Sequence, residues 1–400
     1  MKDWRKVLRV VLGLCLAAGG ATLVERHRAE RAPYAAGPVL SESDGRIREI
    51  VIHYVAEAAP IVEQAYRQFL GQLASDVAVH VVCPDRRAFD DLVARVGPVP
   101  CRLLPVAVGH EITCWSRDRW LAFEPAGPGQ PVALLSPGSE EGAELWPLRA
   151  GDSRVADDLA HAFGGSVLSQ RSDLYFDGGD FLADDRTVFV APGVVRRNLQ
   201  LTVQSEAELV ALLERTLRRR VVLLREAPDH HVAMFMMTAG DGAVLVGDPS
   251  LAKGLLREGE APAEPSPGRA DGSAGASPSR DGFGRGLCPT GGGADFSEAT
   301  QRLFDAVAEQ CRAAGYRVTR IPTVPGCDAR TYLTYLNVVI DQRDGHRIVY
   351  LPVYNAVPRL NEAAAAVWRS LGYEVQPVDC SAVYSHFGTL GCLVNVLRRG

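Results

Sequence analysis

Residues 47–83 read IREIVIHYVAEAAPIVEQAYRQFLGQLASDVAVHVVC, in which a helical pattern lies between two strand-like runs. The first run, 47–54, is apolar and β-branched, and 59–73 places apolar residues at helical spacing. The second strand is predicted at 77–83. The alternation continues with a short helix at 87–96 and a strand at 101–108. Strands that alternate with helices along a chain indicate the α/β class.

Comparable strand–helix pairs recur along the rest of the chain. They lie at 132–135 with 156–163, at 187–191 with 205–218, at 243–246 with 296–314, and at 347–353 with 360–371. Together with the first unit they give about five sequential α/β modules, and such a series suggests a repeat architecture.

The first 25 residues differ from the rest. Four basic residues precede an uncharged apolar run at 10–24, which is the pattern of a secretory signal. The run is shorter than the ~20 residues of a membrane-spanning helix. We therefore expect 1–25 to be a signal peptide that is cleaved or kept as a membrane anchor, followed by a polar linker at 26–45. The protein is then exported, as a periplasmic, secreted or membrane-anchored protein.

A second unusual segment interrupts the fourth module. Residues 257–293 are dominated by Gly, Pro, Ala and Ser and have almost no large apolar side chains. Such a segment buries too little surface to offset the entropy lost on ordering. It predicts a disordered insertion within a single domain at 46–400.

The composition limits the partners. A net charge of −5 argues against nucleic acid or an anionic membrane surface as the main partner. The nine cysteines show neither a CxxC pair nor the spacing of zinc ligands, so no metal site is predicted. The sequence leaves the oligomeric state open.

Two stretches place carboxylates close together. The first, CWSRDRW at 114–120, holds Asp118 between two arginines, a pattern that also fits a surface ion pair. The second, FDGGDF at 176–181, places two glycines between Asp177 and Asp180. Because glycine has no Cβ, the backbone can approach a ligand there. The same residues also fit a turn with an Asx cap.

Two further stretches carry groups for acid–base and nucleophilic chemistry. DHHVAMFMM at 229–237 puts two histidines at the start of an apolar run, so His231 lies at the mouth of a strand or is an ordinary structural histidine. SHFGTLGCLVN at 385–395 leads through Gly388 and Gly391 into Cys392. A glycine turn can expose a thiol and direct backbone N–H groups towards it, which favours a reactive thiolate. The alternative is a small buried cysteine at the start of a helix.

In this order the stretches resemble the motifs of the pentein superfamily, which includes agmatine, arginine and peptidyl-arginine deiminases, dimethylarginine hydrolases and amidinotransferases. Residues 388–392 lie where the family places its G-G-x-x-H-C nucleophile, and the resemblance covers roughly residues 45–397. The other matching stretches are WSRD at 115–118 (W-x-R-D), DGGD at 177–180 ([DE]-G-G-[DN]), HVAMF at 231–235 (H-x-D-x-F) and YLN at 335–337 (S-Y-x-N).

The resemblance implies a five-bladed α/β propeller with the active site in its central channel. It also implies hydrolysis of a guanidino group on an arginine derivative, agmatine or peptidyl arginine, and requires neither a metal nor an organic cofactor. Cys392 would be the nucleophile that forms a thiouronium intermediate, His231 the general acid and base, and Asp177 a third catalytic group. The residues implied to bind the guanidinium substrate are Asp118, Asp180, Trp115 and Asn337.

Three departures from the family pattern matter. Ala233 stands where many members have a carboxylate, although the dimethylarginine hydrolases also lack it. Gly391 replaces the histidine before the cysteine, and Arg119-Trp120 replaces Gly-Pro after the aspartate. These departures argue against agmatine deiminase proper. They leave two alternatives open: an amidinotransferase, in which an amine replaces water, and a pentein-fold binding protein without catalysis.

Overall fold

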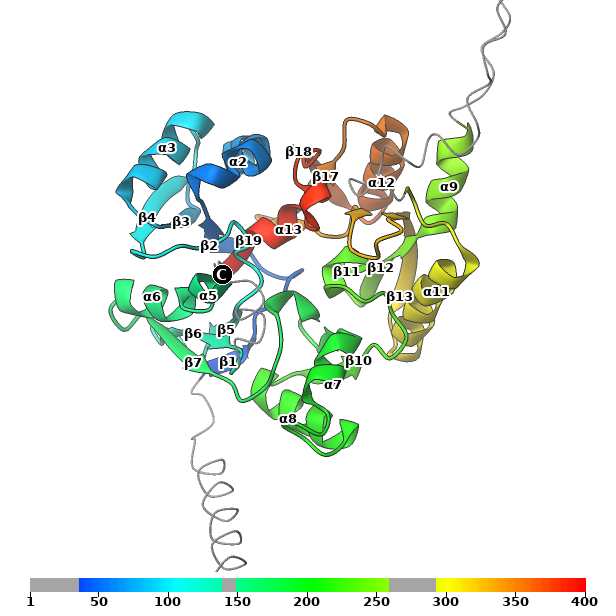
Figure 1. The fold of residues 1–400 in the computed structure, drawn as a ribbon, viewed down its shortest axis with the longest axis horizontal. Coiled ribbons are helices and arrows are strands. Elements are labelled where there is room, and N and C mark those ends of the chain that lie inside the picture. The colour runs from blue at the N-terminus through cyan, green and yellow to red at the C-terminus, as the bar shows by residue number, and fades with distance from the viewer. Residues whose placement is uncertain (1–35, 139–148, 259–292) are drawn as a thin grey trace, which may run out of the picture. The chain divides into compact units, whose positions relative to one another are not determined.

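The structure is a computed structural model that describes residues 36–138, 149–258 and 293–400. Within these residues the strands form five sheets of three or four strands and one sheet of two. Figure 1 shows the larger sheets around a common centre, with most helices on the outside. The α/β class predicted from the sequence is confirmed.

Three of the five larger sheets are built from consecutive strands of the chain, and the other two each include one strand from elsewhere in the chain. The first of these two contains β19 (Val394–Arg399), β2 (Ile47–His53), β3 (Ala78–Cys83) and β4 (Arg102–Ala107). The second sheet contains β1 (Ala36–Val39), β5 (Leu121–Pro125), β6 (Val132–Ser136) and β7 (Val167–Arg171). The others are β8 (Phe181–Ala183), β9 (Thr187–Val190) and β10 (Arg220–Leu223); β11 (Met236–Thr238), β12 (Ala243–Asp248) and β13 (Arg317–Pro322); and β16 (Val339–Arg343), β17 (His346–Val353) and β18 (Tyr373–Asp379).

These five sheets share one internal order. In each, one strand pairs antiparallel with a neighbour on one side and parallel with a neighbour on the other, and these three strands are β19–β2–β3, β5–β6–β7, β8–β9–β10, β11–β12–β13 and β16–β17–β18. A helical segment joins the two parallel strands, as parallel pairing requires. The helices in these connections include α2 (Ala59–Gln72), α6 (Val155–Ala162), α8 (Glu206–Leu217), α11 (Glu298–Ala313) and α12 (Pro358–Ser370). The repeated unit agrees with the series of five modules expected from the sequence.

The first sheet shows why these residues form these elements. Helix α2 buries Val62, Tyr66 and Phe69, which recur at a spacing of three or four residues and therefore lie on one face. All six residues of β3 are buried, as expected for a strand covered on both faces. The helix and the sheet thus share one apolar core.

Strand β19 joins this sheet from the far end of the sequence. It pairs antiparallel with β2, so that Val394 lies opposite Ile52. The short helix α13 (Leu390–Leu393) immediately precedes β19 and lies near the centre of the arrangement in Figure 1. The pairing of β19 therefore fixes the position of Cys392.

The predicted linker at 26–45 is wrong in its second part. Residues 36–39 form β1, which pairs antiparallel with β5, and Ser41 and Ser43 are buried. The polar residues of the segment suggested a linker, but the backbone pairing of β1 to β5 makes 36–39 part of the fold. The predicted signal at 1–25 and the first part of the linker lie outside the described residues. So does most of the predicted insertion at 257–293, although α9 (Pro249–Glu258) runs into its first two residues.

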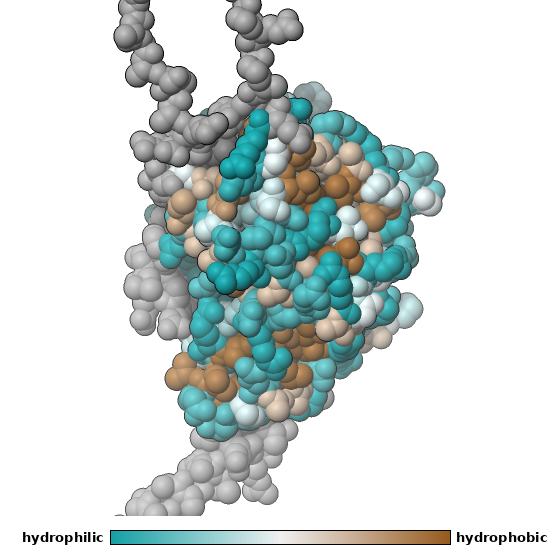
Figure 2. All heavy atoms as spheres, turned by 90° about the vertical axis from the view of Figure 1, so that its right-hand side faces the viewer, coloured by the Kyte–Doolittle hydropathy of each residue, from teal (hydrophilic) through white to brown (hydrophobic). Residues whose placement is uncertain are grey.

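The face shown in Figure 2 is mainly hydrophilic, with apolar side chains in separate groups among the polar ones. Among the residues that the structure describes, no helix is long and apolar enough to cross a membrane.

Candidate active site

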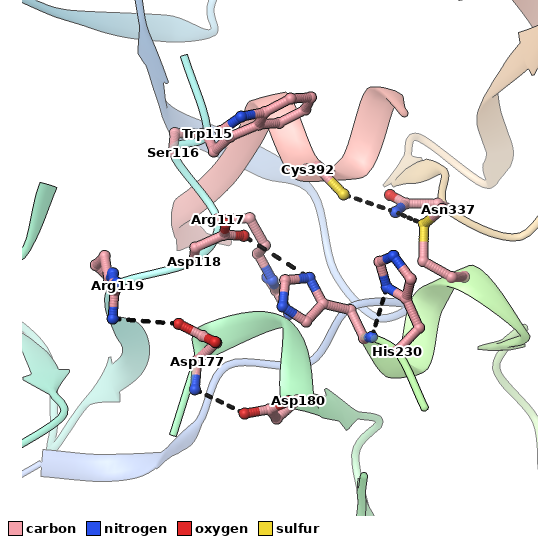
Figure 3. A network of polar contacts seen from close by, with 12 residues as sticks. Trp115, Ser116, Arg117, Asp118, Arg119, Asp177, Asp180, His230, Asn337 and Cys392 are labelled. Atoms are coloured by element: carbon pink, nitrogen blue, oxygen red, sulfur yellow. Dashed lines mark hydrogen bonds and ion pairs between the residues drawn. The ribbon is translucent and has the colours of Figure 1, made fainter. Parts of the chain in front are cut away.

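A cavity of about 750 Å³ opens where four distant stretches of the chain meet. Its wall includes the predicted residues Trp115, Asp118, Asp177, Asp180, His231 and Cys392. Figure 3 shows these stretches converging. Backbone hydrogen bonds join them, because the N–H of Arg117 donates to the carbonyl of Cys392 at 3.3 Å and the N–H of Gly178 to that of Asp118 at 2.6 Å.

Cys392 lies in α13 with only 4% of its surface exposed, at the wall of the cavity. The Nδ2 of the buried Asn337 lies 2.9 Å from its Sγ and 2.9 Å from the Sδ of Met234. The carbonyl of Asn337 accepts from the N–H of Gly391 at 3.1 Å and from the Thr389 hydroxyl at 3.3 Å. Asn337 therefore contacts the Cys392 thiol but does not line the 750 Å³ cavity.

The position of the Asn337 side chain explains why residue 391 is a glycine. A Cβ at position 391 would lie 2.1 Å from the Oδ1 of Asn337. Any side chain there would push the amide away from Cys392. The glycine that replaces the motif's histidine is thus what lets Asn337 reach the sulfur.

His231 lies just before the 3₁₀ turn η3 (Val232–Met234). A Cβ at position 179 would lie 2.4 Å from its Nδ1, so Gly179 of the turn η2 (Gly178–Asp180) makes room for the imidazole. The neighbouring His230 accepts a hydrogen bond at its Nδ1 from the His231 backbone N–H at 2.7 Å. This places the imidazole between the two aspartate-bearing stretches and the thiol.

The surroundings of His231 favour its protonated form. Burial lowers the pKa of His231, but the charge of Asp118, a hydrogen bond with Cys392 and the charges of Asp180 and Asp177 outweigh burial and raise it to about 10. The nearest carboxylate oxygen is Oδ1 of Asp118, 3.8 Å from Nδ1. An imidazolium therefore lies beside the thiol at neutral pH.

Asp118 is buried, and its two carboxylate oxygens differ in their partners. Its Oδ2 forms an ion pair with Arg149 of α5 (Arg149–Asp152). Its Oδ1 accepts no hydrogen bond from the described residues. Burial raises the pKa of Asp118, but Arg149, His231 and Arg119 together lower it below its ordinary value. The carboxylate is therefore charged, and its Oδ1 faces the His231 imidazole without accepting a hydrogen bond from the described residues.

The other two aspartates are paired with arginines of the chain. The Asp177 carboxylate lies 3.3 Å from Arg119 and 3.3 Å from Arg197, and Asp180 forms an ion pair with Arg197. The Oδ2 of Asp180 also accepts from the Asp177 backbone N–H at 2.6 Å. Asp180 thus holds the turn in shape, and Asp177 stands between two guanidinium groups.

Trp115 covers the approach to Cys392 on another side. Its ring packs on Gly388, where a Cβ would lie 2.5 Å from the indole. In Figure 3 the indole lies beside the helix that carries Cys392.

No protein-family model matches the sequence, and no curated protein matches it. Solved structures do. An agmatine deiminase from C. jejuni is 12% identical with a TM-score of 0.61, and the match covers 90% of this chain and 95% of that one. An agmatine deiminase of Enterococcus faecalis is 14% identical with a TM-score of 0.60, again over 90% and 95%. The chain has the pentein fold. At these identities the likeness concerns the fold alone.

Several residues of this site gave no signal in the sequence. Arg149 and Arg197, which pair with the aspartates, come from α5 and from α7 (Pro192–Asn198), outside every motif. His230 is held neutral, because burial first and the charge of His231 second lower its pKa to about 3. Its adjacency to His231 was visible in the sequence, but not its role as an acceptor.

The described part of the chain contains no group of three or more His, Cys, Asp or Glu side chains suited to a metal ion. The polar groups of the cavity are instead a thiol, an imidazole, carboxylates and guanidinium groups. Such a set suits a cationic planar ligand, because carboxylates form paired, charge-assisted hydrogen bonds with guanidinium.

Proposed function

We propose that the chain hydrolyses a guanidino group on an arginine derivative, agmatine or peptidyl arginine, through a covalent intermediate on Cys392. One observation carries the proposal: the Cys392 thiol, the His231 imidazole and the Asp118 carboxylate, whose Oδ1 accepts no hydrogen bond from the described residues, line one cavity. These are a nucleophile, a proton carrier and an anchor for a guanidinium.

Binding comes first in the proposed reaction. The guanidinium donates to Oδ1 of Asp118, and Asp177 accepts from it where it is not held by Arg119 and Arg197. We assign Asp180 to positioning, because it is bonded to the backbone of Asp177. Trp115 borders the ligand. The carboxylates orient the group in a cavity where water is displaced, which strengthens these hydrogen bonds.

The chemical steps follow from the charges. Cys392 attacks as a thiolate, because the thiolate and not the thiol is the nucleophile. The sulfur attacks the central guanidinium carbon, and a C–S bond forms. His231 then donates its proton to the leaving nitrogen, the C–N bond breaks, and ammonia or an amine departs from a thiouronium. The neutral imidazole next takes a proton from water, whose oxygen attacks the same carbon. The C–S bond breaks and the remaining proton of the attacking water passes to solvent or to the released ammonia. A neutral ureido compound leaves, and the thiolate and the imidazolium are restored.

The alternatives differ in what can be measured. In an amidinotransferase the same groups act but an amine replaces water, so a ureido product would be absent. A binding protein without catalysis was suggested by Ala233 and Gly391. The contact of Gly391 with Asn337 gives that glycine a role beside the thiol, which favours the catalytic reading.

The test measures ammonia and ureido products with arginine, agmatine, methylarginine and an arginine peptide. Cys392→Ala and His231→Ala are each expected to abolish turnover. Full turnover by Cys392→Ala would overturn the assignment. An amidine reagent that alkylates thiols is expected to label Cys392; because Cys327 is an exposed cysteine, the labelling is done in a Cys327→Ser background.

We also propose two features beyond the site. The five sheets with their shared order support a five-bladed propeller around the cavity. Residues 1–25 are proposed to direct export or anchor the protein, which a fusion of 1–40 to a reporter would test by its location.

A further inference from the structure

Phe387 adopts a backbone conformation that disfavours its side chain. It ends the 3₁₀ turn η4 (Tyr384–His386) with φ 69° and ψ 21°, in the left-handed region. A bulky residue is an outlier there, because its Cβ crowds the following carbonyl. The G-G-x-x-H-C motif that this stretch resembles has glycine at this position, which would be free of the strain.

The side chain of Phe387 also gains little from packing. It is 44% exposed, and it is the only aromatic among the exposed large apolar side chains of the described residues. It nevertheless lies at a defined place, since it lines the 750 Å³ cavity together with Cys392. Residue 387 thus has a strained backbone and a solvent-exposed aromatic ring in the wall of the cavity.

The cavity is graded from a buried to an exposed end. Cys392 and Asp118 are 4% and 5% exposed, whereas Phe387 is 44% exposed. The other exposed residues of the wall, Arg196, Asp229, Arg330 and His386, are charged or polar, so Phe387 is the apolar contact open to a carbon chain that runs from Asp118 to solvent. Strain that persists at a functional site is a reason to suspect a role for the residue.

We infer that Phe387 is a specificity-determining residue that covers the carbon chain carrying the guanidinium. The inference rests on the proposed function and deepens it. The substrate class is a guanidine on an alkyl chain of several carbons, and the ring shields that chain from water. A small guanidine such as methylguanidine binds without reaching the ring.

The test compares kcat/KM for methylguanidine and butylguanidine in the unchanged protein and in Phe387→Gly. The unchanged protein is expected to favour butylguanidine by about tenfold, the effect of burying roughly two methylene groups at ~0.8 kcal/mol each. In Phe387→Gly this preference is expected to vanish, because kcat/KM falls about tenfold more for butylguanidine than for methylguanidine. Because glycine relieves the strain, the Tm is expected to rise by about 2 °C.

Gln200→Gly is the matched control. Gln200 is exposed, has φ 67° and lies outside the cavity wall. It is expected to raise the Tm similarly and to leave the chain-length preference intact. The inference would be overturned if Phe387→Gly kept the preference for butylguanidine, whether the two kcat/KM values stayed the same or fell by an equal factor.

A failure of the proposed reaction can be told apart from a failure of the role assigned to Phe387. If the unchanged protein hydrolyses no guanidine, the proposed reaction is wrong. Calorimetric binding of the two guanidines to Cys392→Ala, with and without Phe387→Gly, then decides the role of Phe387. If Cys392→Ala binds butylguanidine more tightly than methylguanidine and the added Phe387→Gly removes this difference, the inference is supported. If the ratio of the two affinities is the same with and without Phe387→Gly, the inference is refuted.

Discussion

Gly391 offers a sharp test of how the nucleophile is supported. In an ordinary helix, replacing glycine by alanine stabilises the fold by roughly 0.5–1 kcal/mol. Here the new Cβ would lie 2.1 Å from the Oδ1 of Asn337. The backbone of Asn337 cannot retreat, because its carbonyl accepts from Gly391 and from Thr389. The amide must therefore turn away from Cys392.

The cost of Gly391→Ala can be worked out from its parts. Overpacking a dense interior costs roughly 1–3 kcal/mol, and a buried amide that loses its partners costs roughly 1–3 kcal/mol. Set against the helical gain, the midpoints give a net loss of about 3 kcal/mol in the free energy of unfolding. Turnover is expected to fall with it, since the thiol loses its neighbour.

Urea unfolding and guanidine hydrolysis measure the two effects. Gly254→Ala in α9 is the control, because nothing lies within 4 Å of its added Cβ, and it is expected to be slightly more stable than the unchanged protein. Adding Asn337→Ala to Gly391→Ala removes the clash and is expected to recover stability without recovering turnover. A Gly391→Ala protein as stable as the Gly254→Ala control would show that the contact with Asn337 has been misjudged.

Three further predictions concern charge. The pKa of His231, raised to about 10, keeps the general acid protonated through neutral pH, so kcat/KM is expected to hold up to about pH 9 and to fall as the pH passes 10. Asp118→Asn removes the charge that does most to raise the pKa of His231, so the alkaline limb of a pH–rate profile should move to lower pH. The KM should rise at least about tenfold, because a charge-assisted hydrogen bond to the substrate is lost. His230, with its pKa lowered to about 3, takes up a proton only on unfolding between pH 6.5 and 3, so the free energy of unfolding should fall by on the order of 1.4 kcal/mol per unit of pH below 6.5. Urea unfolding at pH 6.5 and 5.5 should show a smaller fall in His230→Asn, and an identical fall would count against a neutral buried His230.

The sequence predicted the first three parallel strands, one strand of each later sheet, and a helix that follows it, because segments such as 77–83 and 59–73 are long enough to show a period. The parallel partners β7, β10, β13 and β18 were missed. The strands that pair antiparallel with the predicted ones were missed too, since a strand such as β8, which spans only Phe181–Ala183, is too short to show a period. β1 was missed for a different reason, because its pairing to β5 depends on backbone contacts that leave no mark on composition.

The candidate site was predictable where the motif residues themselves meet. Cys392, His231 and Asp118 line one cavity, as their order in the motifs suggested. The arginines were not predictable, because Arg149 and Arg197 reach the aspartates only through the fold. Nor could the sequence reveal that Gly391 and Asn337 depend on each other, since the two positions are far apart in the chain and touch through a single missing Cβ.

The pairing of β19 with β2 also determines when the site can exist. Proteins are made from the N-terminus and begin to fold during synthesis, whereas contacts between residues distant in the chain form late. β2 and β3 emerge early, but the partner of Ile52 is Val394. A growing chain therefore holds its histidine and its aspartates for a long time before the thiol joins them. Until residues 394–399 have been made and have paired with β2, the groups of the candidate site are not all in one place.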